Sequence, residues 1–277
     1  MADPRARARA AATPALTIAP PRTLRLVLAY DGTAYHGWQI QPSLPTVQGA
    51  VLAAARRCLG DGVRVTGASR TDAGVHALGQ VVSLRTNGAL AATAVHGALN
   101  ALLPADVRVL QVMEAGEGFD ARRAAAGKRY AYVVDNAPVA APLMRRCAWH
   151  IGVPLDVTAM RRALGAIRGR HDFSAFCAAA GRAAEPTCCV RAAHVVKRKG
   201  RIVLLLSADR FLHHMVRNIV GSVVEVGRGR REPSWVAGVL ASRDRARAAA
   251  TAPAHGLVLV RVLYPLAQSR GPHGFPR

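Results

Sequence analysis

The sequence predicts an α+β protein built from two ferredoxin-like domains, each with the element order β-α-β-β-α-β. Two observations support this fold class. Segments in which apolar residues alternate, typical of strands, are interrupted by segments in which they recur every three to four positions, typical of helices. The order of these segments in the first half of the 277-residue chain is then repeated in the second half. We expect the strands to form antiparallel or mixed sheets.

The first domain is expected over residues 23–115. Its opening strand, at 23–31, places alternate apolar side chains on one face, namely Leu24, Leu26, Leu28 and Tyr30. Thr46 then precedes an apolar stripe and can cap a helix, because its hydroxyl can accept a free backbone N–H. The remaining predicted elements are strands at 62–67, 79–86 and 106–113 and a helix at 89–103.

The second domain is expected over residues 116–266, with the boundary between Gly116 and Gly127. Its opening strand is predicted at 128–135 and its hairpin at 190–209, turning at Gly200. Helices are predicted at 156–169, capped by Asp156, at 211–227 and at 233–242, and a closing strand at 256–265. Residues 1–22 are expected to be a disordered basic arm, and residues 267–277 a flexible tail.

The chain is strongly basic, with 38 Lys and Arg against 16 Asp and Glu, a formal charge of +22. Such a charge favours a polyanionic partner, most commonly a nucleic acid. The alternative is that a GC-rich genome has enriched arginine, but this does not explain the scarcity of acidic residues. No apolar run reaches the roughly 20 residues of a membrane span, so we expect no membrane association.

The five cysteines are odd in number, irregularly spaced and without a C-x-x-C pair. A disulfide framework is therefore not expected, and a reducing cytoplasm is the predicted location. A zinc site would need paired ligand spacing. The available cysteines and histidines lack it, so no metal is predicted at His171, Cys177, Cys188, Cys189 and His194.

One loop carries the chemistry that we predict. Residues 67–84 read GASRTDAGVHALGQVVSL, in which Asp72 lies between two expected strands with Arg70 two positions before it. A nearby guanidinium would favour and orient the ionised carboxylate. A glycosidase-like site would need a second carboxylate flanking the bond, and the nearest acidic residues in sequence are Asp61 and Asp106. Motifs of serine hydrolases, phosphate-binding loops and aromatic RNA-recognition modules are missing from the sequence.

Eight segments, spread along nearly the whole chain, together resemble a known family. The segments that carry this resemblance are YDGTAYHGWQIQP, TVQGAV, GASRTDAGVHALGQV, LNALLPADVRV, FDARRAAAGKRYAYVV, HDFSAF, FLHHMVRNIVGSVVEVG and GLVLVRVLYP. In this order the chain resembles TruA-type tRNA pseudouridine synthases over residues 23–266, nearly all of the chain between the two tails.

The resemblance implies the pseudouridine synthase fold and the conversion of uridine to pseudouridine at positions 38, 39 and/or 40 of the tRNA anticodon arm. It also implies a homodimer without a metal or an organic cofactor. The family's catalytic aspartate, the expected nucleophile, falls on Asp72, its loop arginine on Arg70 and its active-site tyrosine on Tyr130. The candidate substrate contacts are Arg70, Thr71, Arg122, Lys128, Arg129, Tyr130, His213, His214 and Arg217.

Chemistry leaves the role of Asp72 open, because a carboxylate could trap the sugar, add to the uracil ring or remove a sugar proton. Tyr130 could stack on the uracil or relay a proton, and Arg70 could fill the space left by a flipped base. The sequence departs from the family at residues 119–125, where FDARRAA replaces the usual FHARFSA, and Ser69 stands where some members have glycine. A synthase for another RNA and an inactive RNA-binding protein are the alternatives.

Overall fold

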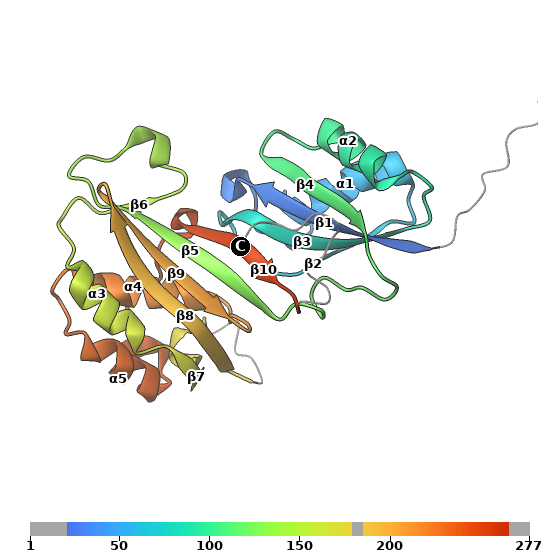
Figure 1. Cartoon of the computed structure of the whole chain (residues 1–277). Coiled ribbons are helices and arrows are strands. Elements are labelled where there is room, and N and C mark those ends of the chain that lie inside the picture. Colours follow the sequence, from blue (N-terminus) through green and yellow to red (C-terminus); the bar gives the residue numbers. More distant parts are fainter. Residues whose placement is uncertain (1–20, 179–184, 266–277) are drawn as a thin grey trace, which may run out of the picture.

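The computed structural model describes residues 21–178 and 185–265, and it confirms an α+β architecture with one large mixed sheet (Figure 1). The strand order is β4-β1-β3-β10-β5-β9-β8-β7, with β2 paired to β3 and β6 paired to β5. The predicted C-terminal tail and, up to residue 20, the predicted basic arm lie outside the described residues. No helix among the described residues is long and apolar enough to cross a membrane.

Among the described residues, the first half of the chain contains two α-helices and four strands. The helices are α1 (Val47–Leu59) and α2 (Ala92–Leu102), and the strands are β1 (Arg22–Tyr30), β2 (Arg64–Gly67), β3 (His76–Thr86) and β4 (Val107–Glu114). Thr46 caps α1 as predicted, since its Oγ1 accepts the backbone N–H of Gly49 at 3.2 Å. The apolar side of β1, carried by Leu24, Leu26 and Leu28, is fully buried.

In the described part of the second half there are three α-helices and six strands. The helices are α3 (Val157–Gly165), α4 (Met215–Gly227) and α5 (Ser234–Ser242), and the strands are β5 (Gly127–Asp135), β6 (Trp149–His150), β7 (Gly169–Asp172), β8 (Thr187–Arg198), β9 (Arg201–Ala208) and β10 (Leu257–Leu263). Figure 1 shows α1 and α2 with the strands of the first half and α3, α4 and α5 with those of the second.

Most differences between predicted and observed elements lie at their ends. Helix α4 begins at Met215 and not at residue 211, because His214 adopts a left-handed backbone conformation (φ 60°, ψ 2°) that interrupts a right-handed helix. Strand β3 begins three residues earlier than predicted, at His76. Strands β6 and β7 were not predicted, since two and four residues are too few for a periodic pattern to stand out.

The two halves share their sheet through β10. This closing strand of the second half pairs antiparallel with β5 of its own half and parallel with β3 of the first half. Tyr30 pairs with Ala77, Ala77 with Leu259, and Leu259 with Tyr130. Because directly paired residues point to the same face of a sheet, these four side chains form one row across the junction, with a tyrosine from each half at its ends.

Candidate active site

The loop of residues 68–75 connects β2 to β3 and is tied to both tyrosines of this row. Thr71 Oγ1 lies 2.8 Å from Tyr30 Oη, and Ser69 Oγ lies 2.9 Å from Tyr130 Oη. Both pairs are buried. Buried hydroxyls that lose their partner cost free energy, so the two contacts fix the loop at the junction of the halves.

The loop is also held by the backbone of the segment that follows β1. Trp38 N–H donates to the Thr71 carbonyl at 3.0 Å, and Gly74 N–H donates to the Tyr35 carbonyl at 3.2 Å. Gly37 allows this approach: its φ is +90°, and a Cβ there would lie 2.6 Å from the Thr71 oxygen. The glycines around the loop therefore permit close backbone packing that other residues would prevent.

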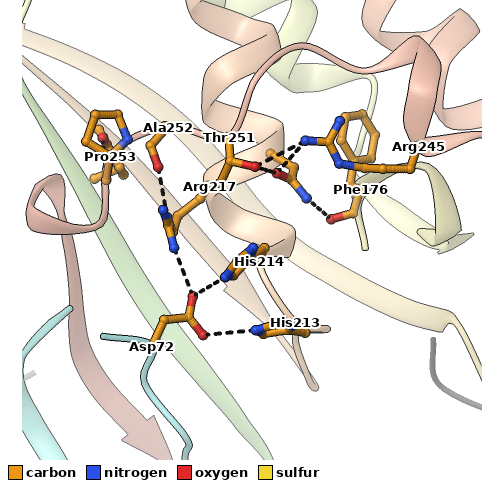
Figure 2. A network of polar contacts seen from close by, with 11 residues as sticks. Asp72, Phe176, His213, His214, Arg217, Arg245, Thr251, Ala252 and Pro253 are labelled. Atoms are coloured by element: carbon orange, nitrogen blue, oxygen red, sulfur yellow. Dashed lines mark hydrogen bonds and ion pairs between the residues drawn. The ribbon is translucent and has the colours of Figure 1, made fainter. Parts of the chain in front are cut away.

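The Asp72 carboxylate faces the N-terminal end of α4 (Figure 2). Arg217 Nη1 lies 3.3 Å from Oδ2, His214 Nε2 3.4 Å from the same oxygen, and His213 Nε2 3.7 Å from Oδ1. The Asp72 side chain is 23% exposed, so the carboxylate is held by three nitrogen-bearing side chains and still reachable from solvent.

The guanidinium beside Asp72 is not the expected one. Proximity in sequence predicts that Arg70 orients the carboxylate, but Arg217, 145 positions away, occupies that place. Arg70 is exposed, and no ion pair joins it to Asp72 in the part of the chain that the structure describes. Asp72 is turned toward α4, which explains why its partner comes from the second half.

The two histidines lie against each other, with ring centroids 4.0 Å apart and an angle of 37° between the rings. The left-handed conformation of His214 lets neighbouring residues direct both rings at one carboxylate. Burial lowers the pKa of His214, and the nearby charges of His213, Arg217 and Arg245 lower it further, whereas Asp72 acts in the opposite direction. His214 is therefore neutral at neutral pH, and Arg217 supplies the permanent positive charge at Asp72.

Asp72, His213 and His214 also form a group of metal-ligand type, with ligand atoms within 4.8 Å of one another. However, the Arg217 guanidinium lies against the same carboxylate. A cation bound there would be repelled by this fixed positive charge, so the chemistry of the donor set does not favour a metal.

Tyr130 is buried, with 5% of its surface exposed. Its ring and that of Phe211 form a T-shaped contact, with centroids 5.2 Å apart and an interplanar angle of 88°. Burial raises the pKa of Tyr130 to about 12; the hydrogen bond from Ser69 opposes this rise, and the charge of Asp72 adds to it. The phenol is therefore protonated at neutral pH and lies close enough to Asp72 to sense its charge.

Comparisons with known proteins identify the family of the chain. A tRNA pseudouridine synthase family model matches residues 26–122 and 163–265. The chain belongs to the tRNA pseudouridine synthase family. A tRNA pseudouridine synthase A from Myxococcus xanthus is 48% identical over 242 residues, which are 87% of this chain and 91% of the relative. Its namesake from Moorella thermoacetica is 45% identical over 243 residues, covering 87% and 99%. The family predicted from the sequence is confirmed.

Thr71 of the synthase was predicted as a substrate contact, but its hydroxyl is used within the protein. The residue is 6% exposed, and its Oγ1 is bonded to Tyr30. Burial raises the pKa of Tyr30, so the Tyr30 phenol remains protonated beside it. In this structure Thr71 holds the loop, while the neighbouring Asp72 reaches solvent.

The three basic candidates near β5 lie in different environments. Arg122 is exposed in a turn closed by Asp120, whose Oδ1 accepts the backbone N–H of Arg122 at 2.8 Å. Burial lowers the pKa of Lys128, and the charge of Arg122 lowers it further. Arg129 is exposed on the face of β5 opposite Tyr130, since successive strand residues point to opposite faces. It lines a hollow of about 250 Å³ with Ala192, His194, Leu205, Leu206 and Ser207.

No local pattern in the sequence indicates that Arg217 is the partner of Asp72, or that Arg245 and Thr251 lie against the neighbouring Asn218. Asn218 is fully buried, and Arg245 and Thr251 both contact its side chain. The only signal in the sequence was the position of Arg217 and Asn218 in a segment that resembles the family. Neither periodicity nor spacing connects these residues to the loop of Asp72.

Proposed function

We propose that this synthase converts uridine to pseudouridine at positions 38, 39 and/or 40 in the anticodon arm of tRNA, with Asp72 as the essential carboxylate and nucleophile. The observation that carries the proposal is the partly exposed Asp72 carboxylate, held by Arg217 on a loop anchored to Tyr130. Family membership supplies the reaction class, and the anticodon positions come from the resemblance of the sequence.

The reaction breaks the N1–C1′ bond, turns the uracil and forms a C5–C1′ bond; C5 loses a proton and N1 gains one. No net oxidation, reduction or group transfer to another molecule occurs, so the substrate supplies every atom of the product. The partly exposed Asp72 carboxylate would attack C1′ or the uracil ring, while Arg217 and the two histidines orient it from α4.

Tyr130 is proposed to contact the uracil. Because only 5% of the residue is exposed, a uracil can stack on its ring only after side chains that pack around Tyr130 move aside. Because the pKa of Tyr130 is raised to about 12, the residue stays a protonated phenol at neutral pH and almost no tyrosinate is present to act as a base. This favours a stacking and donor role over removal of the C5 proton by a tyrosinate.

Arg70 is proposed to support base flipping. It is exposed two residues before Asp72, so its side chain can enter the helix stack while Asp72 receives the nucleotide. Flipping costs a few kcal/mol, which contacts between the basic surface and RNA phosphates can offset. Arg122, Lys128, Arg129, His213 and His214 remain the candidates for further RNA contacts.

We also propose a domain organisation, an oligomeric state and a cellular location. The order β4-β1-β3-β2 in the first half and β10-β5-β9-β8 in the second supports two ferredoxin-like domains, at 23–115 and 116–266. The family resemblance supports a homodimer. The five cysteines are free thiols, which is consistent with a reducing cytoplasm.

The decisive experiment maps pseudouridine on an unmodified tRNA transcript after incubation with the wild-type protein or with Asp72→Asn. We expect new signals at positions 38 to 40 with the wild type alone. Signals in another RNA only would support a synthase of different specificity. Binding of tRNA without any isomer would reduce the protein to an RNA-binding function.

A further inference from the structure

The direction of the Arg217 side chain is set at both ends of its guanidinium. Nη1 points to Asp72, and Nε–H donates to the Ala252 carbonyl at 2.8 Å. The backbone of Ala252 also donates its N–H to the Arg217 carbonyl at 3.2 Å. The position of Ala252 therefore decides where the charge of Arg217 lies relative to the reactive carboxylate.

Ala252 belongs to a segment, residues 248–253, that is neither helix nor strand. Such a segment has no ladder of backbone hydrogen bonds to fix it, so side chains must hold it in place. It lies directly against α4: a Cβ on Gly221 would be 2.1 Å from the Ala250 oxygen. One helical turn apart on α4, Asn218 and Ser222 bind this segment.

Asn218 is the centre of this attachment. Its fully buried side chain donates from Nδ2 to the Phe176 carbonyl at 2.8 Å and accepts at Oδ1 from the Thr251 hydroxyl at 2.7 Å. Arg245 Nη2 donates to the same Oδ1 at 3.1 Å and lies 3.1 Å from Thr251 Oγ1. Arg245 Nη1 donates to the Ala249 carbonyl at 3.0 Å. Figure 2 shows the contacts that link Arg245, Thr251 and Phe176 through the side chain of Asn218.

We propose that Asn218, Thr251 and Arg245 are positioning residues of this synthase: they fix the segment 248–253 so that the Ala252 carbonyl aims Arg217 at Asp72. None of the three touches Asp72 in the described contacts, so each acts through Arg217. The expected effect on catalysis rests on the proposed function. The expected effect on the position of Arg217 rests only on the contacts described above.

We call the contacts that lead from Asn218, Thr251 and Arg245 through the segment 248–253 to Arg217 the relay. It can be tested with variants that each change one side-chain group. Arg245→Gln removes the charge and most donors. Thr251→Val removes one hydroxyl and keeps the shape, and Thr251→Ser restores the hydroxyl. Arg247→Gln is the matched control, because Arg247 is exposed in the same short 3₁₀ helix (Arg245–Arg247) and its side chain has no hydrogen bond or ion pair within the described residues.

We expect Arg245→Gln to lower kcat by about 10- to 100-fold, the range that follows when a reacting group is misplaced by an ångström or less, with little change in tRNA affinity. Thr251→Val should lower kcat and Thr251→Ser restore it, while Arg247→Gln remains like the wild type. In an Arg217→Lys background, Arg245→Gln should have no further effect, since residues that act through one group are not additive.

A second readout does not depend on activity. The Arg217 Nε–H group, bound to Ala252, should give a protected NMR signal in the wild type and lose that protection in Arg245→Gln but not in Arg247→Gln. An unchanged signal in Arg245→Gln would overturn the relay even if the proposed reaction were absent. If the wild type is active on tRNA and Arg245→Gln loses the protection but keeps the wild-type kcat, the relay does not position Arg217 for catalysis.

Discussion

Arg217 Nη1 lies 3.3 Å from Asp72 Oδ2, although 145 residues separate the two in the chain. The contact exists because β10 pairs with β3 and so brings the loop that precedes β3 against α4 of the other half. The Asp72 carboxylate and the positive charge beside it therefore come from different halves. Each half alone holds only one member of the pair.

This pairing predicts a large catalytic effect of Arg217. Arg217→Ala should lower the single-turnover rate of pseudouridine formation by about 100-fold or more, the range seen when one fixed donor is removed from an active site. Arg217→Lys keeps the charge but not the two-ended geometry, so its rate should lie between those of Arg217→Ala and wild type. If both variants isomerise tRNA at the wild-type rate, Asp72 does not depend on this partner.

The α+β architecture and the place of the Asp72 loop between two strands could be predicted from the sequence, because both leave local patterns. The alternation of β1 and the cap at Thr46 lie within a few residues of the elements that they define. The partner of Asp72 left no such pattern. It depends on the parallel pairing of His76 with Val258, two residues far apart in the chain. Because of this long-range contact, the guanidinium beside Asp72 belongs to Arg217 and not to Arg70.

The lowered pKa of His214 predicts a pH dependence of stability. A histidine is half protonated in an unfolded chain near pH 6.5, whereas burial delays protonation of His214 in the folded protein to lower pH. Between these two values the unfolded state binds more protons, so the free energy of unfolding falls as the pH falls below about 6.5. His255, whose pKa burial also lowers, adds to this slope.

His214→Asn should therefore make the stability profile flatter between pH 7 and pH 5, about the range over which His titrates. Asparagine tolerates the left-handed conformation of this position, so the start of α4 is preserved. Urea unfolding at several pH values measures the slope, and His150→Asn, altering an exposed histidine, is the control. An equal slope in wild type and His214→Asn would show that His214 protonates equally in the folded and unfolded protein.

The hydrogen bond between Ser69 and Tyr130 predicts a measurable coupling. Ser69→Ala and Tyr130→Phe each remove one hydroxyl and leave the other buried without its partner. Each single variant should lose about 1 kcal/mol of stability, and the double variant should lose less than the sum of both. The denaturant midpoints of the wild type, the two single variants and the double variant measure the coupling in a double-mutant cycle. Additive losses would mean that the two hydroxyls do not interact.

The net charge of +22 predicts that tRNA affinity falls steeply with salt. Each phosphate neutralised on a duplex contributes a slope of about −0.9 to the logarithm of the affinity against the logarithm of salt concentration. Arg129→Gln tests whether the sheet face opposite Tyr130 contributes, because loss of a phosphate contact reduces the slope by about 1. If the affinity stays constant from low to physiological salt, the protein does not bind tRNA through several phosphate contacts.

Two glycines with similar positive φ values make it possible to distinguish the loss of stability caused by backbone strain from displacement of the Asp72 loop. Gly37 and Gly60 have φ values of +90° and +88°, but a Cβ on Gly37 would lie 2.6 Å from the Thr71 oxygen, whereas one on Gly60 meets nothing within 4 Å. Both alanine variants should lose on the order of 1–3 kcal/mol of stability from backbone strain. Only Gly37→Ala should also displace the Asp72 loop and lower kcat, measured where both variants remain folded. Equal activity of the two variants would show that the close packing at Thr71 does not position Asp72.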